Sequence, residues 1–134
     1  MFSIPNLQPA TLIEIHKTGF EAHTPIIGQA LLAVARADAK VLMMTHACAQ
    51  GHFQFCVRCA DTYRVLGELR ALFACSPTLT CTARDVTLVR DSDPRRLQSH
   101  LARADVEVVA TAKDLHSEQY IIAEVWNKNA PSDV

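Results

Sequence analysis

Glycine is scarce in this chain of 134 residues, which contains only four glycines. The glycine-rich loops that cradle phosphates, G-x-G-x-x-G and G-x-x-x-x-G-K-[ST], are absent from the sequence. The serine elbow of the α/β-hydrolases, G-x-S-x-G, and the zinc-protease motif H-E-x-x-H are absent as well. These absences weigh against several large enzyme classes. The sequence therefore leans away from an enzyme and predicts no cofactor.

The chain also lacks an excess of charge of either sign and a long apolar run. Its net charge is −1, from 13 basic and 14 acidic residues, which argues against a protein whose main role is to neutralise phosphates. The longest apolar run, residues 26–35, is interrupted by Gln29 and is too short to span a membrane. No basic segment followed by an apolar run opens the chain, so we expect no signal peptide and a cytoplasmic location.

Cysteine, in contrast, occurs five times, an odd number that cannot pair completely within one chain. Free thiols in a reducing cytosol are the simplest interpretation. Residues 40–59, KVLMMTHACAQGHFQFCVRC, hold three of these cysteines and two histidines. Zinc sites combine such side chains at short spacing. A thiol- or zinc-dependent enzyme, or a zinc-stabilised module, is therefore an alternative function, with these candidate ligands: Cys48, His52, Cys56 and Cys59.

The same segment predicts a β-hairpin, and the hairpin argues against that zinc site. Gln50-Gly51 is typical of a tight turn, and folding the chain there pairs Cys48 with Phe53 and His46 with Phe55. Because side chains alternate along a strand, Cys56 and Cys59 would point to opposite faces. We therefore expect buried structural cysteines, since free cysteine packs like a small apolar residue.

Local signals along the rest of the chain predict a single α+β domain in the order α-α-β-β-α-β-α-β-β. Capping residues and first-turn prolines predict helices over 11–17, 25–37, 62–74 and 94–104. Alternation predicts strands over 78–89, 106–112 and 119–126, with a bulge or short turn near Arg84-Asp85. We expect helices on one face of a mainly antiparallel sheet. Residues 1–8 would form an extended lead-in and 128–134 a loose tail.

Two of the predicted helices have informative apolar patterns. The helix over 25–37 is apolar on most of its faces, so we expect it to be buried or covered by a partner. The helix over 62–74 carries an inner stripe that faces the sheet: Tyr63, Leu66, Leu69, Leu72 and Phe73.

An all-helical fold is the alternative, because the chain is rich in alanine and apolar residues also recur at steps of three and four. In that case LIEIHKTGFEAHT and AVARADAKVL resemble the amphipathic, alanine-rich helices of phasins, the coat proteins of polymer granules. The resemblance implies a helical coat or scaffold protein. The β-branched runs TLTCT, DVTLV and VEVVAT favour strands instead.

The function favoured by these observations is a small non-catalytic interaction module, either a homodimer or an inhibitor or adaptor that covers a partner protein. The last strand is the expected edge or interface, because aromatic residues are enriched at interface centres. Its candidate residues are Tyr120, Ile122 and Trp126.

Nucleic-acid binding is a weaker hypothesis that depends on a group of arginines: Arg90, Arg95, Arg96 and Arg103. Helix starts often contact phosphates, but Asp91 and Asp93 are interleaved with these arginines. No aromatic residues alternate with them to stack on bases. A solvated face of mixed charge is the expected outcome.

Overall fold

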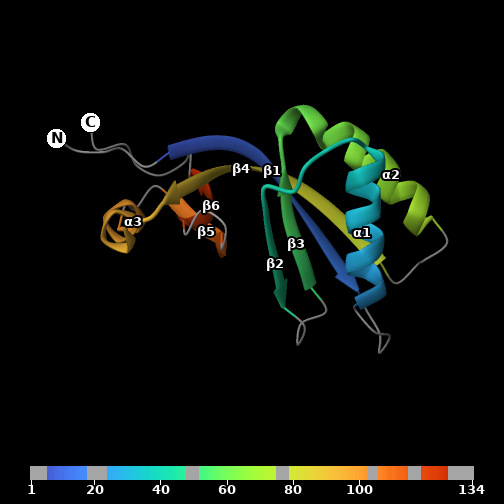
Figure 1. Ribbon diagram of the computed structural model, residues 1–134. Helices are drawn as coiled ribbons and strands as arrows, with labels where there is room; N and C mark the ends of the chain where they lie inside the picture. The colour runs from blue at the N-terminus through green and yellow to red at the C-terminus, as the bar shows by residue number, and fades with distance from the viewer. Residues whose placement is uncertain are drawn as a thin grey trace. The chain divides into compact units, whose positions relative to one another are not determined.

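Six strands and three α-helices make up the part of the chain that the structure describes, which is residues 6–17, 24–47, 52–74, 79–102, 106–114 and 119–126 of a computed structural model. Figure 1 shows the elements in chain order: β1 (Asn6–Lys17), α1 (Thr24–Arg36), β2 (Met43–Ala47), β3 (His52–Val57), the 3-10 turn η2 (Cys59–Asp61), α2 (Thr62–Phe73), β4 (Leu79–Asp91), α3 (Pro94–Leu101), β5 (Val106–Asp114) and β6 (Gln119–Trp126).

The strands are hydrogen-bonded in the order β2-β3-β1-β4-β6-β5, which confirms the α+β class and the antiparallel sheet. The all-helical alternative is wrong. The chain divides into a larger unit, Thr11–Arg84, and a smaller unit, Met1–Ala10 with Asp85–Val134. Strands β1 and β4 contribute residues to both units. Within the described residues, no helix is long and apolar enough to cross a membrane.

The first element corrects the predicted order, because residues 11–17 form a strand and not a helix. Strand β1 pairs with β3 from Thr11 opposite Val57 to His16 opposite His52. Ile13 and Ile15, two positions apart, are both buried in the core of the larger unit. β-Branched residues at alternate positions suit a sheet. Pro9, which suggested a helix start, lies exposed within the strand.

The core of the larger unit lies between the sheet and its two helices. Phe53 and Phe55 of β3 contribute two rings that are tilted by 31° to each other, with centroids 5.5 Å apart. Ala33 and Val34 of α1 and Leu69 of α2 pack into the same cluster. Both helices therefore cover one face of the strands in this unit (Figure 1).

The hairpin β2–β3 forms as predicted, but its register differs by two residues. His46 lies opposite Phe53 and Met44 opposite Phe55, whereas the turn at Gln50-Gly51 would have placed His46 opposite Phe55. A shift of two residues keeps every side chain on its predicted face, so alternation alone cannot distinguish the two registers. Cys48, Gln50 and Gly51 lie outside the described residues.

Helix α2 begins as predicted, but its apolar stripe is only partly correct. Val65 and Leu69 are fully buried, and Leu66, Leu72 and Phe73 pack against the core. Tyr63, predicted to face the sheet, is 88% exposed. The inner face is therefore set by Val65 and Leu69.

The smaller unit confirms the signals around the third helix. Asp93 caps α3, with its side chain accepting a hydrogen bond from the Arg95 backbone N–H at 2.9 Å, and Pro94 occupies the first turn. Strand β4 continues through Arg84-Asp85 without a turn, and this is where the larger unit ends. Val89, Leu97 and Ile122 form a small core between β4, α3 and β6.

Candidate functional site

Helix α1 has two apolar faces, and only one is used by the fold. Ala30, Ala33 and Val34 are buried in the core of the larger unit. The opposite side, called here the outer face of α1, consists of four exposed residues: Gly28, Leu31, Leu32 and Ala35. Their spacing of three and four residues puts them on one stripe of the helix.

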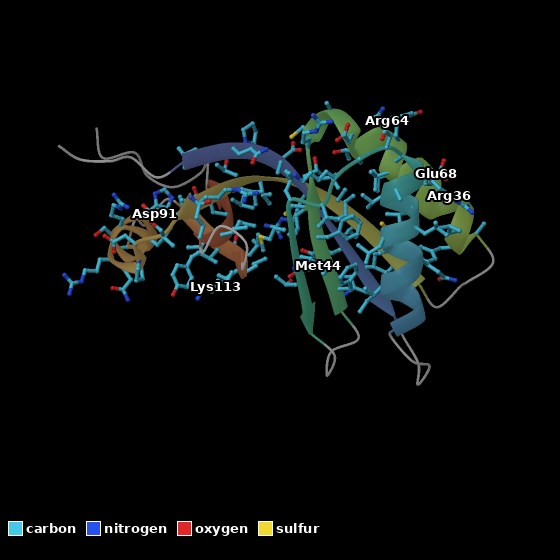
Figure 2. All side chains as sticks on the ribbon, viewed as in Figure 1. Arg36, Met44, Arg64, Glu68, Asp91 and Lys113 are labelled. Carbon is cyan, nitrogen blue, oxygen red and sulfur yellow. The ribbon has the colours of Figure 1, made fainter. Side chains whose placement is uncertain are left out.

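The outer face of α1 has the composition of an interface. Leu31 is 39% exposed and Leu32 is 45% exposed. A Cβ atom added at Gly28 would meet no atom within 4 Å, so this part of the helix is open to a close neighbour. Polar residues Gln29 and Arg36 are exposed beside the stripe (Figure 2 labels Arg36). An apolar patch bordered by polar groups marks an interaction surface.

Strand β2 adds a second exposed feature in the same unit. Among the described strands it lies at one end of the sheet order, and β3 is its one described neighbour. Met44 lies opposite Phe55, which packs in the core beneath α1, and Met44 is 47% exposed. The face of the sheet that α1 covers therefore ends at an exposed apolar side chain.

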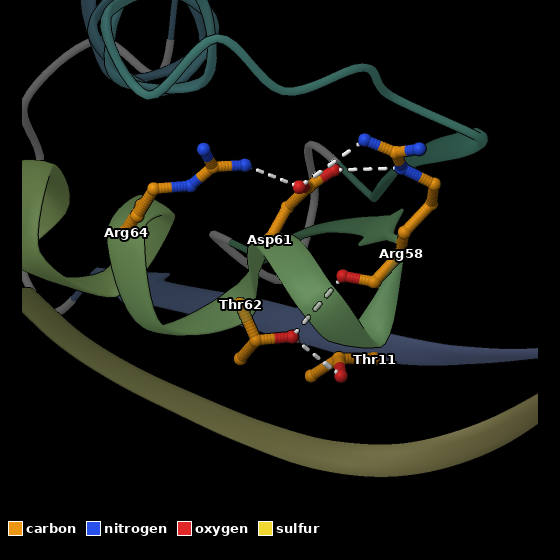
Figure 3. A network of polar contacts seen from close by, with 5 residues as sticks. All are labelled: Thr11, Arg58, Asp61, Thr62 and Arg64. Carbon is orange, nitrogen blue, oxygen red and sulfur yellow. Dashed lines mark hydrogen bonds and ion pairs between the residues drawn. The ribbon is translucent and has the colours of Figure 1, made fainter.

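A charged network fixes the start of α2 (Figure 3). The Asp61 carboxylate is 1% exposed and accepts hydrogen bonds from Arg58 Nε at 2.9 Å and from Arg58 NH2 at 3.2 Å. Arg64 pairs with the same carboxylate. The Thr62 hydroxyl donates a hydrogen bond of 2.7 Å to the Thr11 hydroxyl on β1. Asp61 occupies the N-cap position of α2, but its side chain binds two arginines and makes no capping hydrogen bond.

The network shifts the pKa values of Asp61 and Arg58. The hydrogen bond from Arg58 is the main reason that the pKa of Asp61 lies below its usual range, with Arg64 acting in the same direction against desolvation. The same hydrogen bond raises the pKa of Arg58, with a smaller contribution from Asp38. Each charge in the cluster has an opposite charge beside it, so the network holds the start of α2 in place.

The structure separates the two cysteines of CVRC. Cys56 is buried in β3, and Cys59 lies exposed in η2, after the strand has ended. Cys48 lies outside the described residues, and the side chain of His52 is not among those described. Of the part of the chain that the structure describes, no group of three histidine, cysteine or acidic side chains is placed to hold a metal.

The interface candidates on the last strand occupy an inner position of the sheet. Strand β6 lies between β4 and β5, so the expectation that it forms an edge is wrong. Ile122 is buried in the small core, and Tyr120 is 37% exposed. The side chain of Trp126 is not described. The outer strands are β2 and β5, which no local pattern could identify.

The predicted basic patch is partly neutralised. Arg96 forms an ion pair with Asp91 at 2.8 Å, and Asp91 is buried beside the start of α3. Arg95 is exposed, Arg90 has further contacts, and Arg103 lies outside the described residues. Of the predicted basic patch, Arg96 is therefore paired with acidic residues.

Comparison with solved structures relates this fold to regulatory domains. The regulatory subunit of aspartate kinase from Thermus thermophilus, in its ligand-free form, superposes with a TM-score of 0.68 at 13% sequence identity, covering 93% of this chain and 90% of that chain. The regulatory subunit of aspartate kinase from Thermus flavus gives 0.61 at 15% identity, covering 90% of this chain and 84% of that chain.

A longer enzyme contains the same arrangement in part of its chain. Aspartokinase III from Escherichia coli, in complex with lysine and aspartate, gives a TM-score of 0.61 at 13% identity, covering 92% of this chain and 29% of that chain. No family model matches the sequence, and no curated protein matches it. The likeness to these structures therefore shows the fold alone, an α+β arrangement that this chain shares with the regulatory subunits of aspartate kinase.

Proposed function

We propose that this protein is a non-catalytic regulatory module that acts by self-association, as a homodimer joined through the outer face of α1. The observation that carries the proposal is the exposed stripe of Gly28, Leu31, Leu32 and Ala35 on a helix whose other face is fully buried. The likeness of the fold to regulatory subunits supports a regulatory role over a catalytic one.

The outer strand β2 extends the proposed interface. A stable interface buries roughly 800 Å² on each partner, which is more than four residues of one helix supply. Strand β2 offers unpaired backbone groups for a second strand, and Met44 offers apolar area on the face that α1 covers. In a two-fold dimer the same surface serves both copies, so each exposed residue contributes twice.

The test is the molar mass of the purified protein across a wide range of concentrations, measured by sedimentation equilibrium. We expect a concentration-dependent dimer that Leu31→Gln weakens. Tyr63→Gln is the matched control, because Tyr63 is an exposed apolar residue on the other helix of the same unit. A chain that stays monomeric at all concentrations would leave the stripe to a different protein partner and would reject the homodimer.

A further inference from the structure

A groove in the smaller unit lies between α3 and the strands β5 and β6, and none of its lining residues belongs to the proposed dimer surface. Its volume is about 410 Å³, within the range of roughly 300–1,000 Å³ typical of small-molecule sites. Leu97 of α3 and Ile122 of β6 supply its apolar wall. Its polar side chains come from both sides: Gln98, Thr111, Lys113 and Tyr120.

A β-bulge puts two of these polar residues into the groove. Val108 lies opposite Glu124, but beyond it β5 contains one extra residue, so Thr111 lies opposite Ile122 and Lys113 opposite Tyr120. Without the bulge, the regular register would place Ala110 and Ala112 at those two positions. Bulges commonly re-aim side chains beside functional sites. Here the bulge replaces two methyl groups by a hydroxyl and an ammonium.

The ammonium of Lys113 is available for a ligand. Its Nζ lies 5.5 Å from the centroid of the Tyr120 ring, and among the described residues it forms no ion pair with a carboxylate. Figure 2 labels Lys113 on β5 and Asp91 in the same unit. Asp91 is already occupied by Arg96. The described lining of the groove contains a cation and no carboxylate.

These features select one class of ligand. An apolar body fits against Leu97 and Ile122, and a negative group fits at Lys113, where a charge-assisted hydrogen bond is strong. Thr111, Tyr120 and Gln98 line the same groove, and their hydroxyl and amide groups can donate hydrogen bonds to a ligand. A positive group on the ligand would find no carboxylate in the described lining.

We propose that this groove binds a small monocarboxylate with an apolar chain or ring and no ammonium group. The amino acids named with aspartokinase III, lysine and aspartate, are of a different class, because each carries an ammonium group. The proposal does not depend on the homodimer, since every residue that carries it lies in the smaller unit.

The experiment titrates the isotopically labelled full chain with butanoate, hexanoate and hydrocinnamate, following backbone amide signals by NMR. We expect saturable shifts confined to α3, β5 and β6, with the larger carboxylates binding more tightly. Hydrocinnamamide, which lacks the charge, and phenylalanine, which adds an ammonium to the same skeleton, should each bind about tenfold more weakly or worse.

Two variants decide which side chain provides the charge. Lys113→Gln should weaken hydrocinnamate binding about tenfold or more, while Lys40→Gln, an exposed lysine of the larger unit, should leave it unchanged. Thr111→Tyr, which fills the groove, should abolish binding. Both altered groove residues are exposed, so the variants should keep the wild-type circular dichroism spectrum. Three results would each overturn the proposal. None of the carboxylates saturates the protein, phenylalanine binds as tightly as hydrocinnamate, or Lys113→Gln binds hydrocinnamate as tightly as wild type does.

Discussion

Replacing both leucines of the α1 outer face, as Leu31→Gln with Leu32→Gln, should dissociate the proposed homodimer. Burying a whole leucine side chain contributes about 1.5–3 kcal/mol. The fractions still exposed in one copy, 39% for Leu31 and 45% for Leu32, therefore leave roughly 0.6–1.2 and 0.7–1.4 kcal/mol to be gained in an interface. Because a two-fold interface uses each residue twice, the double variant should lose roughly 2.6–5.2 kcal/mol of association free energy.

That loss corresponds to an increase of the dimer dissociation constant by about two to four orders of magnitude. Sedimentation equilibrium measures it directly, and each single variant should give about half of the free-energy change. The variants should remain folded as monomers, which circular dichroism checks, because neither leucine belongs to the buried core of one copy. A dissociation constant within about threefold of wild type, against the expected hundredfold or more, would refute the use of this surface.

Three further predictions concern the scaffold. Gly28→Ala and Gly67→Ala each have open space for the new methyl group, and each should stabilise the monomer by about 0.5–1 kcal/mol in urea unfolding. Only Gly28→Ala should also alter dimerisation. Equal effects of both variants on dimerisation would contradict the proposed interface. The pKa of Asp61 is lowered in the folded state, so its charge contributes stability above its unfolded pKa of about 3.9. The stability advantage of wild type over Asp61→Asn should therefore be constant near neutral pH and shrink as the pH falls below about 4. A stability difference that does not change with pH would be inconsistent with this prediction. Thiol labelling mapped by mass spectrometry should modify exposed Cys59 readily and buried Cys56 only on unfolding. Labelling of Cys81 should need a higher pH, because desolvation raises the pKa of its thiol. Rapid labelling of Cys56 in the native protein would contradict its buried position.

The sequence predicted helix and strand positions correctly where the signal was contained in a few neighbouring residues. Thr24-Pro25 and Asp93-Pro94 begin α1 and α3, as capping residues followed by proline predict. Strand β6 has the predicted bounds, residues 119–126. The sequence also showed that α1 is apolar on most of its faces, and the exposed outer face is one of these apolar faces.

The misassigned first strand shows where local signals compete. Pro9 before residues 11–17 and Gly19 after them are typical helix start and stop signals. The same segment also has the alternating pattern of a strand, with Thr11, Ile13 and Ile15 on one side. Pairing with β3 along six residues decided between the two patterns. Tertiary hydrogen bonding outweighs a propensity difference of this kind.

The sequence by itself determined the α+β class, the three helix starts and the faces of the hairpin, because caps, prolines and alternation act over a few residues. Only the tertiary structure decided that β6 is an inner strand, that the hairpin register is shifted by two, and that a bulge turns Thr111 and Lys113 towards α3. These features depend on which strands become neighbours. Registers two residues apart present the same faces, and an extra residue in one strand has meaning only against its partner.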